Sequence, residues 1–126
     1  MLDASRVADR CRTLGGSFFE RVPEADAHVL STVLHDWDDE RATQILRCCR
    51  RAVAPQGRLL VVEMVVPPAN APHLSKWLDL NMLVMTPGGR ERTESEWRAL
   101  FAGAGYELAR IVPTTSPMCV LEGVPV

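Results

Sequence analysis

The amino-acid sequence predicts an α/β sandwich that contains part of a Rossmann-like sheet. Segments with the pattern of strands alternate with segments that have the pattern of helices over most of the chain. Two consecutive strand patterns close the chain and predict an antiparallel hairpin. The internal apolar runs do not alternate strictly with polar residues, which favours strands covered on both faces. At 126 residues the chain has the length of one domain.

The first half of the chain contains three predicted strands and one helix. Residues 1–9 predict a helix remnant or a frayed end, and residues 10–14 predict a short strand that ends at a glycine pair. Residues 27–34 are apolar and β-branched, which is typical of a mostly buried strand. A helical period begins at Asp38 and is expected to stop at Pro55, before a second covered strand over residues 58–66.

The second half contains two predicted helices and the hairpin. Ser75 is expected to cap a helix that runs through Met85 and is apolar on most sides. Such a helix is buried in the domain, faces a bound ligand or packs on a partner. Thr93 and Glu96 have the spacing of a capping box for the next helix, which Gly105 ends. Residues 106–112 and 118–124 then predict the strands of the hairpin.

Composition limits the classes of function. A hydrophobic fraction of 47% and a charged fraction of 24% are typical of a soluble globular protein. The net charge of -2, without a basic stripe, argues against nucleic acid as a partner, and no apolar run suits a membrane span. No leader segment is recognisable, so a cytoplasmic location is expected. The four cysteines lack the spacing of a zinc site, so no metal is expected.

Residues 34–40, Leu-His-Asp-Trp-Asp-Asp-Glu, form the strongest candidate site. They follow a predicted strand and open a predicted helix, and ligands of open α/β sheets collect outside the carboxyl ends of strands. His35 could equally be a surface histidine at a helix start. Glu63 stands alone in an apolar strand, where an ionised carboxylate is costly. It therefore lies either at the exposed end of that strand or beside a specific partner.

Several stretches together resemble the S-adenosylmethionine-dependent small-molecule O-methyltransferases of the plant phenolic and bacterial polyketide-tailoring type. The resemblance rests on residues 16–20 (Gly-Ser-Phe-Phe-Glu), 34–40, 57–63, 79–83 and 88–93 (Gly-Gly-Arg-Glu-Arg-Thr), followed by Trp97 and residues 104–106. These stretches occur in order along nearly the whole chain. The motif at residues 34–40 alone is moderately specific for this family. Its combination with residues 88–93 is strong evidence for the resemblance.

The resemblance implies a reaction and a set of roles. His35 would be the general base that takes a proton from the hydroxyl of a small-molecule acceptor, and Glu63 and Glu91 would flank and orient it. An imidazole with an ordinary pKa of about 6.5 suits this task near neutral pH. S-adenosylmethionine would be the methyl donor. The resemblance assigns cofactor contacts to Ser17, Phe18 and Ser31, and acceptor contacts to Asp36, Trp37, Met82, Met85 and Thr86.

The chain also departs from the family pattern. Ser17 stands where the family usually has an acid that reaches the adenine, and Ser31 stands where a lysine is common. The family's N-terminal dimerisation domain, first strands and glycine-rich loop would lie before Met1, and no G-x-G-x-x-G or P-loop motif occurs in the chain. Residues 1–126 are therefore expected to form the C-terminal part of a catalytic domain, with weak or absent cofactor binding on its own.

Two alternatives remain open at this point. The chain could be a catalytically inactive remnant that acts as a self-association or partner-binding module, because open sheet edges and bare apolar faces favour pairing into a homo-oligomer. The adjacent aromatics Phe18 and Phe19 could wedge their loop into the core or form a stacking platform for a ring.

Overall fold

The computed structural model describes residues 8–126, so most of the helix remnant or frayed end expected for residues 1–9 lies outside the described residues. A short 3₁₀ helix, η2 (Ala8–Arg10), is followed by irregular chain through Gly16. The strand predicted for residues 10–14 is wrong. Residues 11–16 are all exposed, because the alternation of Arg and Cys there offers no apolar face to a sheet.

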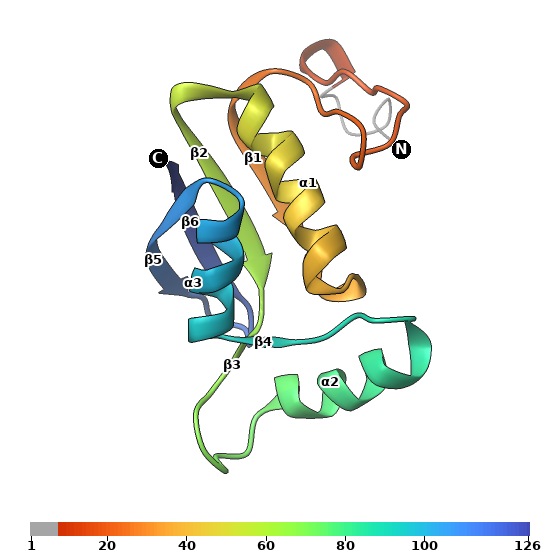
Figure 1. Ribbon diagram of the computed structural model, residues 1–126, viewed down its shortest axis with the longest axis vertical. Helices are drawn as coiled ribbons and strands as arrows, with labels where there is room; N and C mark the ends of the chain where they lie inside the picture. The colour runs from red at the N-terminus through yellow and green to blue at the C-terminus, as the bar shows by residue number, and fades with distance from the viewer. Residues whose placement is uncertain (1–7) are drawn as a thin grey trace.

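Four strands form one sheet in the order β1 (Ala25–Ser31), β2 (Val53–Glu63), β6 (Cys119–Pro125) and β5 (Tyr106–Pro113). β1 and β2 are parallel, whereas β6 is antiparallel to both β2 and β5. The antiparallel hairpin at the end of the chain is thus confirmed, and so is the mixed α/β class (Figure 1).

Two predicted strands differ from the observed ones. β1 is less buried than expected, with Val29 61% exposed, because within residues 8–126 it is an edge strand paired only with β2. The expectation that both faces of the strand at 58–66 are covered is also wrong. Leu59 and Val61 are fully buried, while Leu60 and Val62 on the other face are only half-buried.

Helix α1 (Asp39–Ala52) begins as predicted, where the side chain of Asp38 accepts a hydrogen bond from the amide of Arg41. Its buried face consists of Ala42, Ile45, Leu46, Cys48 and Cys49. The expected stop at Pro55 is wrong, because the chain turns extended at Val53 and enters β2 there. Asp39 and Glu40 at the positive end and two arginines at the negative end stabilise the helix dipole.

Helix α3 (Glu94–Gly103) has the predicted capping box between Thr93 and Glu96. Gly105 follows with a φ of +84°, the left-handed conformation that ends many helices. α1 and α3 lie side by side on one face of the sheet (Figure 1). Trp97 and Phe101 of α3 and Tyr106 of β5 are buried between these helices and the sheet. The hydrophobic core therefore lies between the sheet and these two helices.

Helix α2 (Leu74–Met85) stands apart from this core (Figure 1). Its cap is His73, whose Nδ1 accepts a hydrogen bond from the amide of Ser75, so the predicted Ser75 cap is wrong. The helix begins two residues earlier than expected, so Ser75 lies in its first turn, where it is fully buried and its hydroxyl bonds to the same imidazole. Apolar side chains of α2 lie exposed: Leu74, Trp77, Leu80, Leu83, Val84 and Met85.

A two-stranded parallel ladder joins the helix region to the sheet body. β3 (Val65–Val66) follows β2 directly and pairs with β4 (Arg92–Thr93), which leads into α3. This ladder brings the segment 88–93 against the carboxyl end of β2. The sequence motifs at 34–40, 63 and 88–93 therefore meet at one end of the sheet.

Candidate active site

His35 lies in a single 3₁₀ turn, η3 (Leu34–Asp36), between β1 and α1. The turn follows the carboxyl end of β1, which is the position predicted for a ligand crevice. The alternative of a helix-capping surface histidine is not what the structure shows. Asp38 caps α1, and the His35 side chain is only 18% exposed with its Nδ1 2.7 Å from Oε2 of Glu63.

Glu63 is the last residue of β2 and is almost completely buried. Its Oε1 accepts hydrogen bonds from the amides of Val33 and Leu34, at 3.0 and 2.9 Å, and a longer one from the amide of His35 at 3.4 Å. Its Oε2 accepts from the imidazole. The lone carboxylate of the apolar strand is thus held by specific partners, which is how a buried charge becomes tolerable.

The hydrogen bond to Glu63 raises the pKa of His35, an effect that burial partly offsets and that the charges of Glu63, Asp36 and Glu91 reinforce. With Nδ1–H donating to Glu63, the lone pair of the neutral imidazole is at Nε2. Nε2 lies 3.4 Å from Oδ1 of Asp36, whose side chain is half-exposed. The arrangement gives His35 one orientation, one tautomer and a free basic nitrogen.

Glu91 forms the opposite wall of this site. Its side chain is 5% exposed, its Oε2 has no hydrogen-bond partner among residues 8–126, and burial raises its pKa to about 7. A cavity of about 90 Å³ is lined by His35, Glu63 and Glu91 together with Met82 and four further residues, Thr32, Met64, Leu78 and Met118. The structure therefore brings the three predicted catalytic residues and Met82 together.

The other residues predicted to contact the acceptor lie around this cavity rather than in its lining. Met85 is 71% exposed on α2. Trp37 packs edge-on against Phe19 at 4.8 Å between ring centroids. Thr86 closes the C-terminal end of α2, where its hydroxyl donates to the carbonyl of Met82. For these three residues, contact with an acceptor stays a prediction.

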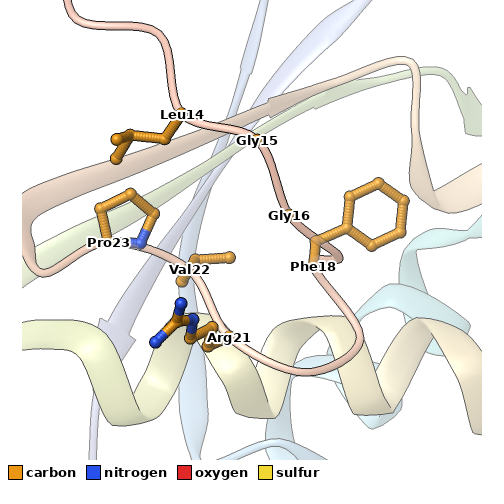
Figure 2. A pocket seen from close by; sticks show the side chains of 7 residues that line it. All are labelled: Leu14, Gly15, Gly16, Phe18, Arg21, Val22 and Pro23. Atoms are coloured by element: carbon orange, nitrogen blue, oxygen red, sulfur yellow. The ribbon is translucent and has the colours of Figure 1, made fainter.

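The predicted cofactor residues lie on a separate loop and at the end of β1. Figure 2 shows the loop that runs from Leu14 through the glycine pair and Phe18 and then turns back toward Pro23. These residues line a hollow of about 430 Å³ that is open to solvent. The hydroxyl of Ser17 accepts a hydrogen bond from the amide of Phe19, which stabilises this turn. Phe18 and Phe19 are half-buried against the core, as expected if they wedge their loop into it. A stacking role for either ring stays a prediction. Ser31 is exposed at the end of β1.

Sequence analysis did not single out three residues that shape the site. Arg92 is fully buried and donates to the carbonyls of Leu34 and Trp37 on both sides of His35. Asp79 accepts the amide of Glu91. Thr32 lines the cavity with a φ of 53°, a rare conformation for a β-branched residue. Arg92 and Asp79 lie inside stretches that matched the family, which was the available signal, whereas no pattern pointed to Thr32.

Two further properties concern residues 8–126. They contain no cluster of three or more His, Cys, Asp or Glu side chains suited to a metal ion. None of the helices in this part of the chain combines the length and the apolar character that crossing a membrane requires.

Known proteins resemble this chain in sequence and in fold. Residues 2–107 match the model of the O-methyltransferase domain. The chain is 50% identical over 121 residues to a phenazine O-methyltransferase of Lysobacter antibioticus, covering 95% of this chain and 35% of that protein. A solved methyltransferase of calicheamicin biosynthesis, in its SAH-bound form, superposes with a TM-score of 0.92 at 44% identity, covering all of this chain and 38% of the other.

A second solved structure is an O-methyltransferase of neocarzinostatin biosynthesis in complex with S-adenosylmethionine and 2-hydroxy-5-methyl naphthoic acid. It superposes with a TM-score of 0.87 at 34% identity and covers 99% of this chain and 36% of the other. The chain thus spans about a third of the length of the relatives it matches. The matched residues 2–107 include His35, Glu63 and Glu91, and the chain belongs to the O-methyltransferase domain family.

Proposed function

We propose that this chain is the C-terminal part of the catalytic domain of an S-adenosylmethionine-dependent O-methyltransferase that acts on a hydroxyl of an aromatic or polyketide-type small molecule. The observation that carries the proposal is the hydrogen bond of 2.7 Å between Glu63 and Nδ1 of His35, beside a cavity that Glu91 also lines. A histidine held in this way has the geometry of a general base.

In the proposed reaction, bound S-adenosylmethionine would give its methyl group to the acceptor oxygen and would leave as S-adenosylhomocysteine. The hydroxyl proton passes to Nε2 of His35. Glu63 stabilises the imidazolium that forms, because its carboxylate accepts the Nδ1–H bond. S-adenosylmethionine supplies the activated methyl group. The protein supplies alignment and a base, worth roughly 10²- to 10⁴-fold for the proton transfer.

The acceptor side of the site is proposed from the residues around the cavity. Met82 lines it, and a flexible, polarisable thioether suits a flat aromatic ring. Asp36, beside Nε2 of His35, would border the acceptor hydroxyl. Trp37, Met85 and Thr86 would complete the acceptor pocket from the neighbouring surfaces. The naphthoic acid bound by the neocarzinostatin enzyme is an aromatic hydroxy acid, which supports this class of acceptor.

The cofactor side is proposed from the open hollow at the glycine pair. Phe18 lines this hollow, and Ser17 lies in the same turn. In our proposal they contact the adenine, and Ser31 contributes from the end of β1. The hollow is open to solvent, and Ser17 replaces a longer acidic side chain. We therefore expect this chain alone to bind S-adenosylmethionine weakly or not at all.

The proposal is tested by methyl transfer in a chimera, in which this chain replaces the matching third of the phenazine O-methyltransferase from Lysobacter antibioticus. We expect turnover on an aromatic hydroxy acid, and a loss of about 10²-fold or more in kcat for His35→Ala. His28→Ala is the matched control, because His28 lies on β1 with its Nε2 against the carbonyl of Pro23. Full turnover by His35→Ala would remove His35 from the role of base.

A second candidate function is self-association of a non-catalytic module. The exposed apolar face of α2, which includes Trp77 and Leu83, favours it, because large apolar patches mark interaction sites. A second copy of this chain would cover the face in a homo-oligomer. Light scattering tests this candidate directly. A dimer that Leu83→Lys converts to a monomer would support it, and a monodisperse monomer of the unmodified chain would exclude it.

A further inference from the structure

We propose that Arg92 is the positioning residue of the site, which holds the turn that carries His35 and thereby fixes the direction of the imidazole. The inference rests on the proposed role of His35 as general base. It concerns a residue that touches neither the acceptor nor the reacting atoms in that proposal. Arg92 acts through the backbone on both sides of His35.

The turn that carries His35 has little stability of its own. Its internal hydrogen bonds are those from Asp36 N to the carbonyl of Val33 and from Trp37 N to the carbonyl of Leu34, both at 3.3 Å. Both are long for N–H···O bonds, and a single 3₁₀ turn fixes several dihedral angles for very few bonds. A defined position for His35 therefore requires groups outside the turn.

Two buried groups of opposite charge supply that support from opposite sides. The Glu63 carboxylate accepts the amides that lead into the turn, as described above. The Arg92 guanidinium donates to the carbonyl of Leu34 at 3.0 Å through Nη1 and to the carbonyl of Trp37 at 2.8 Å through Nη2. The amide of Arg90 donates to the carbonyl of His35 at 2.8 Å. The anion thus meets backbone donors and the cation meets backbone acceptors.

Arg92 is itself fixed in place. Its Nε and Nη2 both lie within 2.9 Å of Oδ1 of Asp39, at 2.9 and 2.8 Å, and its Nη1 also donates to the carbonyl of Arg90 at 3.3 Å. These contacts engage all three nitrogens of the guanidinium. The guanidinium also lies over the ring of Trp97 at 5.3 Å. A fully buried cation that is hydrogen-bonded through all three nitrogens is held in one orientation.

The segment before Arg92 also lies very close to the turn that carries His35. A Cβ at Gly89 would lie 2.5 Å from the carbonyl oxygen of His35 and 2.9 Å from the carbonyl carbon of Asp36. Only glycine allows the backbone to come this near the turn. The segment 89–92 is therefore built against the turn, and Arg92 is its charged anchor.

The test is a titration of the three histidines by NMR in this chain, unmodified and as Arg92→Lys. Lysine keeps the charge but cannot reach both carbonyls with a planar fork. We expect the pKa of His35 to fall by about half a pH unit or more as its bond to Glu63 loosens. Because the positive charge is retained, the fall reports geometry.

Arg98→Lys is the matched control, because Arg98 is an exposed arginine on α3 that bonds to Glu94 and the carbonyl of Leu108. We expect it to leave His35 unchanged. A folded Arg92→Lys protein whose His35 titrates as in the unmodified chain would overturn the proposal. None of these readouts involves methyl transfer, so they are independent of whether His35 proves to be the base.

A second measurement needs no variant, and so decides the matter if Arg92→Lys does not fold. In ¹⁵N spectra of the unmodified chain, we expect the guanidinium protons of Arg92 to exchange slowly with water and to show Overhauser contacts to the Trp97 ring. A freely rotating guanidinium that exchanges fast would overturn the proposal. In the chimera, Arg92→Lys is expected to lower kcat about tenfold with KM unchanged, since small misplacements of a catalytic group are costly. Where His35→Ala lowers kcat in the same chimera, an unchanged kcat for Arg92→Lys would also overturn the proposal.

Discussion

The sheet body, which is the four-stranded sheet with α1 and α3, and helix α2 carry similar apolar side chains but bury them to different extents. In the body, Leu46 of α1 and Phe101 of α3 are completely buried against the strands. On α2, Leu83 is 76% exposed and Val84 is 83% exposed. The sheet body therefore buries these apolar side chains within the chain, whereas those of α2 remain exposed. α2 keeps the apolar surface that a ligand or another polypeptide surface would cover.

The same division runs through the candidate site. The groups proposed to handle the proton, which are His35, Glu63 and Glu91, belong to the body or to the segments anchored on it, and they are held by short hydrogen bonds or burial. The surfaces proposed for the acceptor and the cofactor lie on α2 and on the loop of Phe18, and both are open. The groups proposed for proton transfer are therefore fixed in place within residues 8–126, whereas the surfaces proposed for the acceptor and the cofactor lie open.

The largest test of this comparison is a pair of leucine truncations. Leu46→Ala empties a fully buried position, and we expect the free energy of unfolding to fall by about 2 to 5 kcal/mol. Leu83→Ala removes the same atoms from an exposed position, and we expect a change within about 0.5 kcal/mol. Urea denaturation followed by circular dichroism measures both. Equal losses would show that α2 is packed in solution, through self-association or otherwise.

The second test concerns Glu91, whose pKa is raised by burial from 4.5 to about 7. The folded state binds this proton more tightly than the unfolded state does, so the native chain loses stability as pH rises from about 4.5 through 7. Glu91→Gln removes that loss. At 1.36 kcal/mol per pKa unit, we expect the variant to be more stable by about 3 kcal/mol at pH 8 and nearly equal at pH 4.5.

Glu107→Gln, at an exposed position of β5, is the control for removing a carboxylate. Urea titrations at four pH values give both curves. A flat difference for Glu91→Gln would mean that the carboxyl is solvated or paired in solution, and that the proton-handling side of the site is as open as α2.

The elements that local sequence determines were predicted well. α1, the capping box of α3 and the hairpin depend on hydrophobic period, on capping side chains and on turn residues, all within a few positions of each other. The errors occurred where tertiary partners decide. β1 is more exposed than its apolar residues suggest, because burial depends on which strands and helices lie beside it.

The site was predicted from the resemblance more than from the residues. Twenty-eight positions separate Glu63 from His35, and no local pattern shows that their side chains bond. The lone charge of Glu63 in an apolar strand did indicate a specific partner. Nothing comparable marked Arg92, because an arginine among charged neighbours gives no sign of complete burial. Long-range pairing of polar groups is thus the part of the site that the sequence left undetermined.

The smallest test compares the caps of the two helices. Thr93 accepts the amide of Glu96, and Glu96 accepts the amide of Thr93 in return, so Thr93→Ala should lower the global free energy of unfolding by about 1 kcal/mol. His73→Ala removes the cap of α2. Because α2 contributes little to the core, we expect no global change above about 0.3 kcal/mol, but faster amide exchange along α2 through local opening. Urea denaturation and hydrogen exchange separate the two. Equal losses in the global free energy of unfolding would mean that α2 unfolds together with the sheet body and does not open locally.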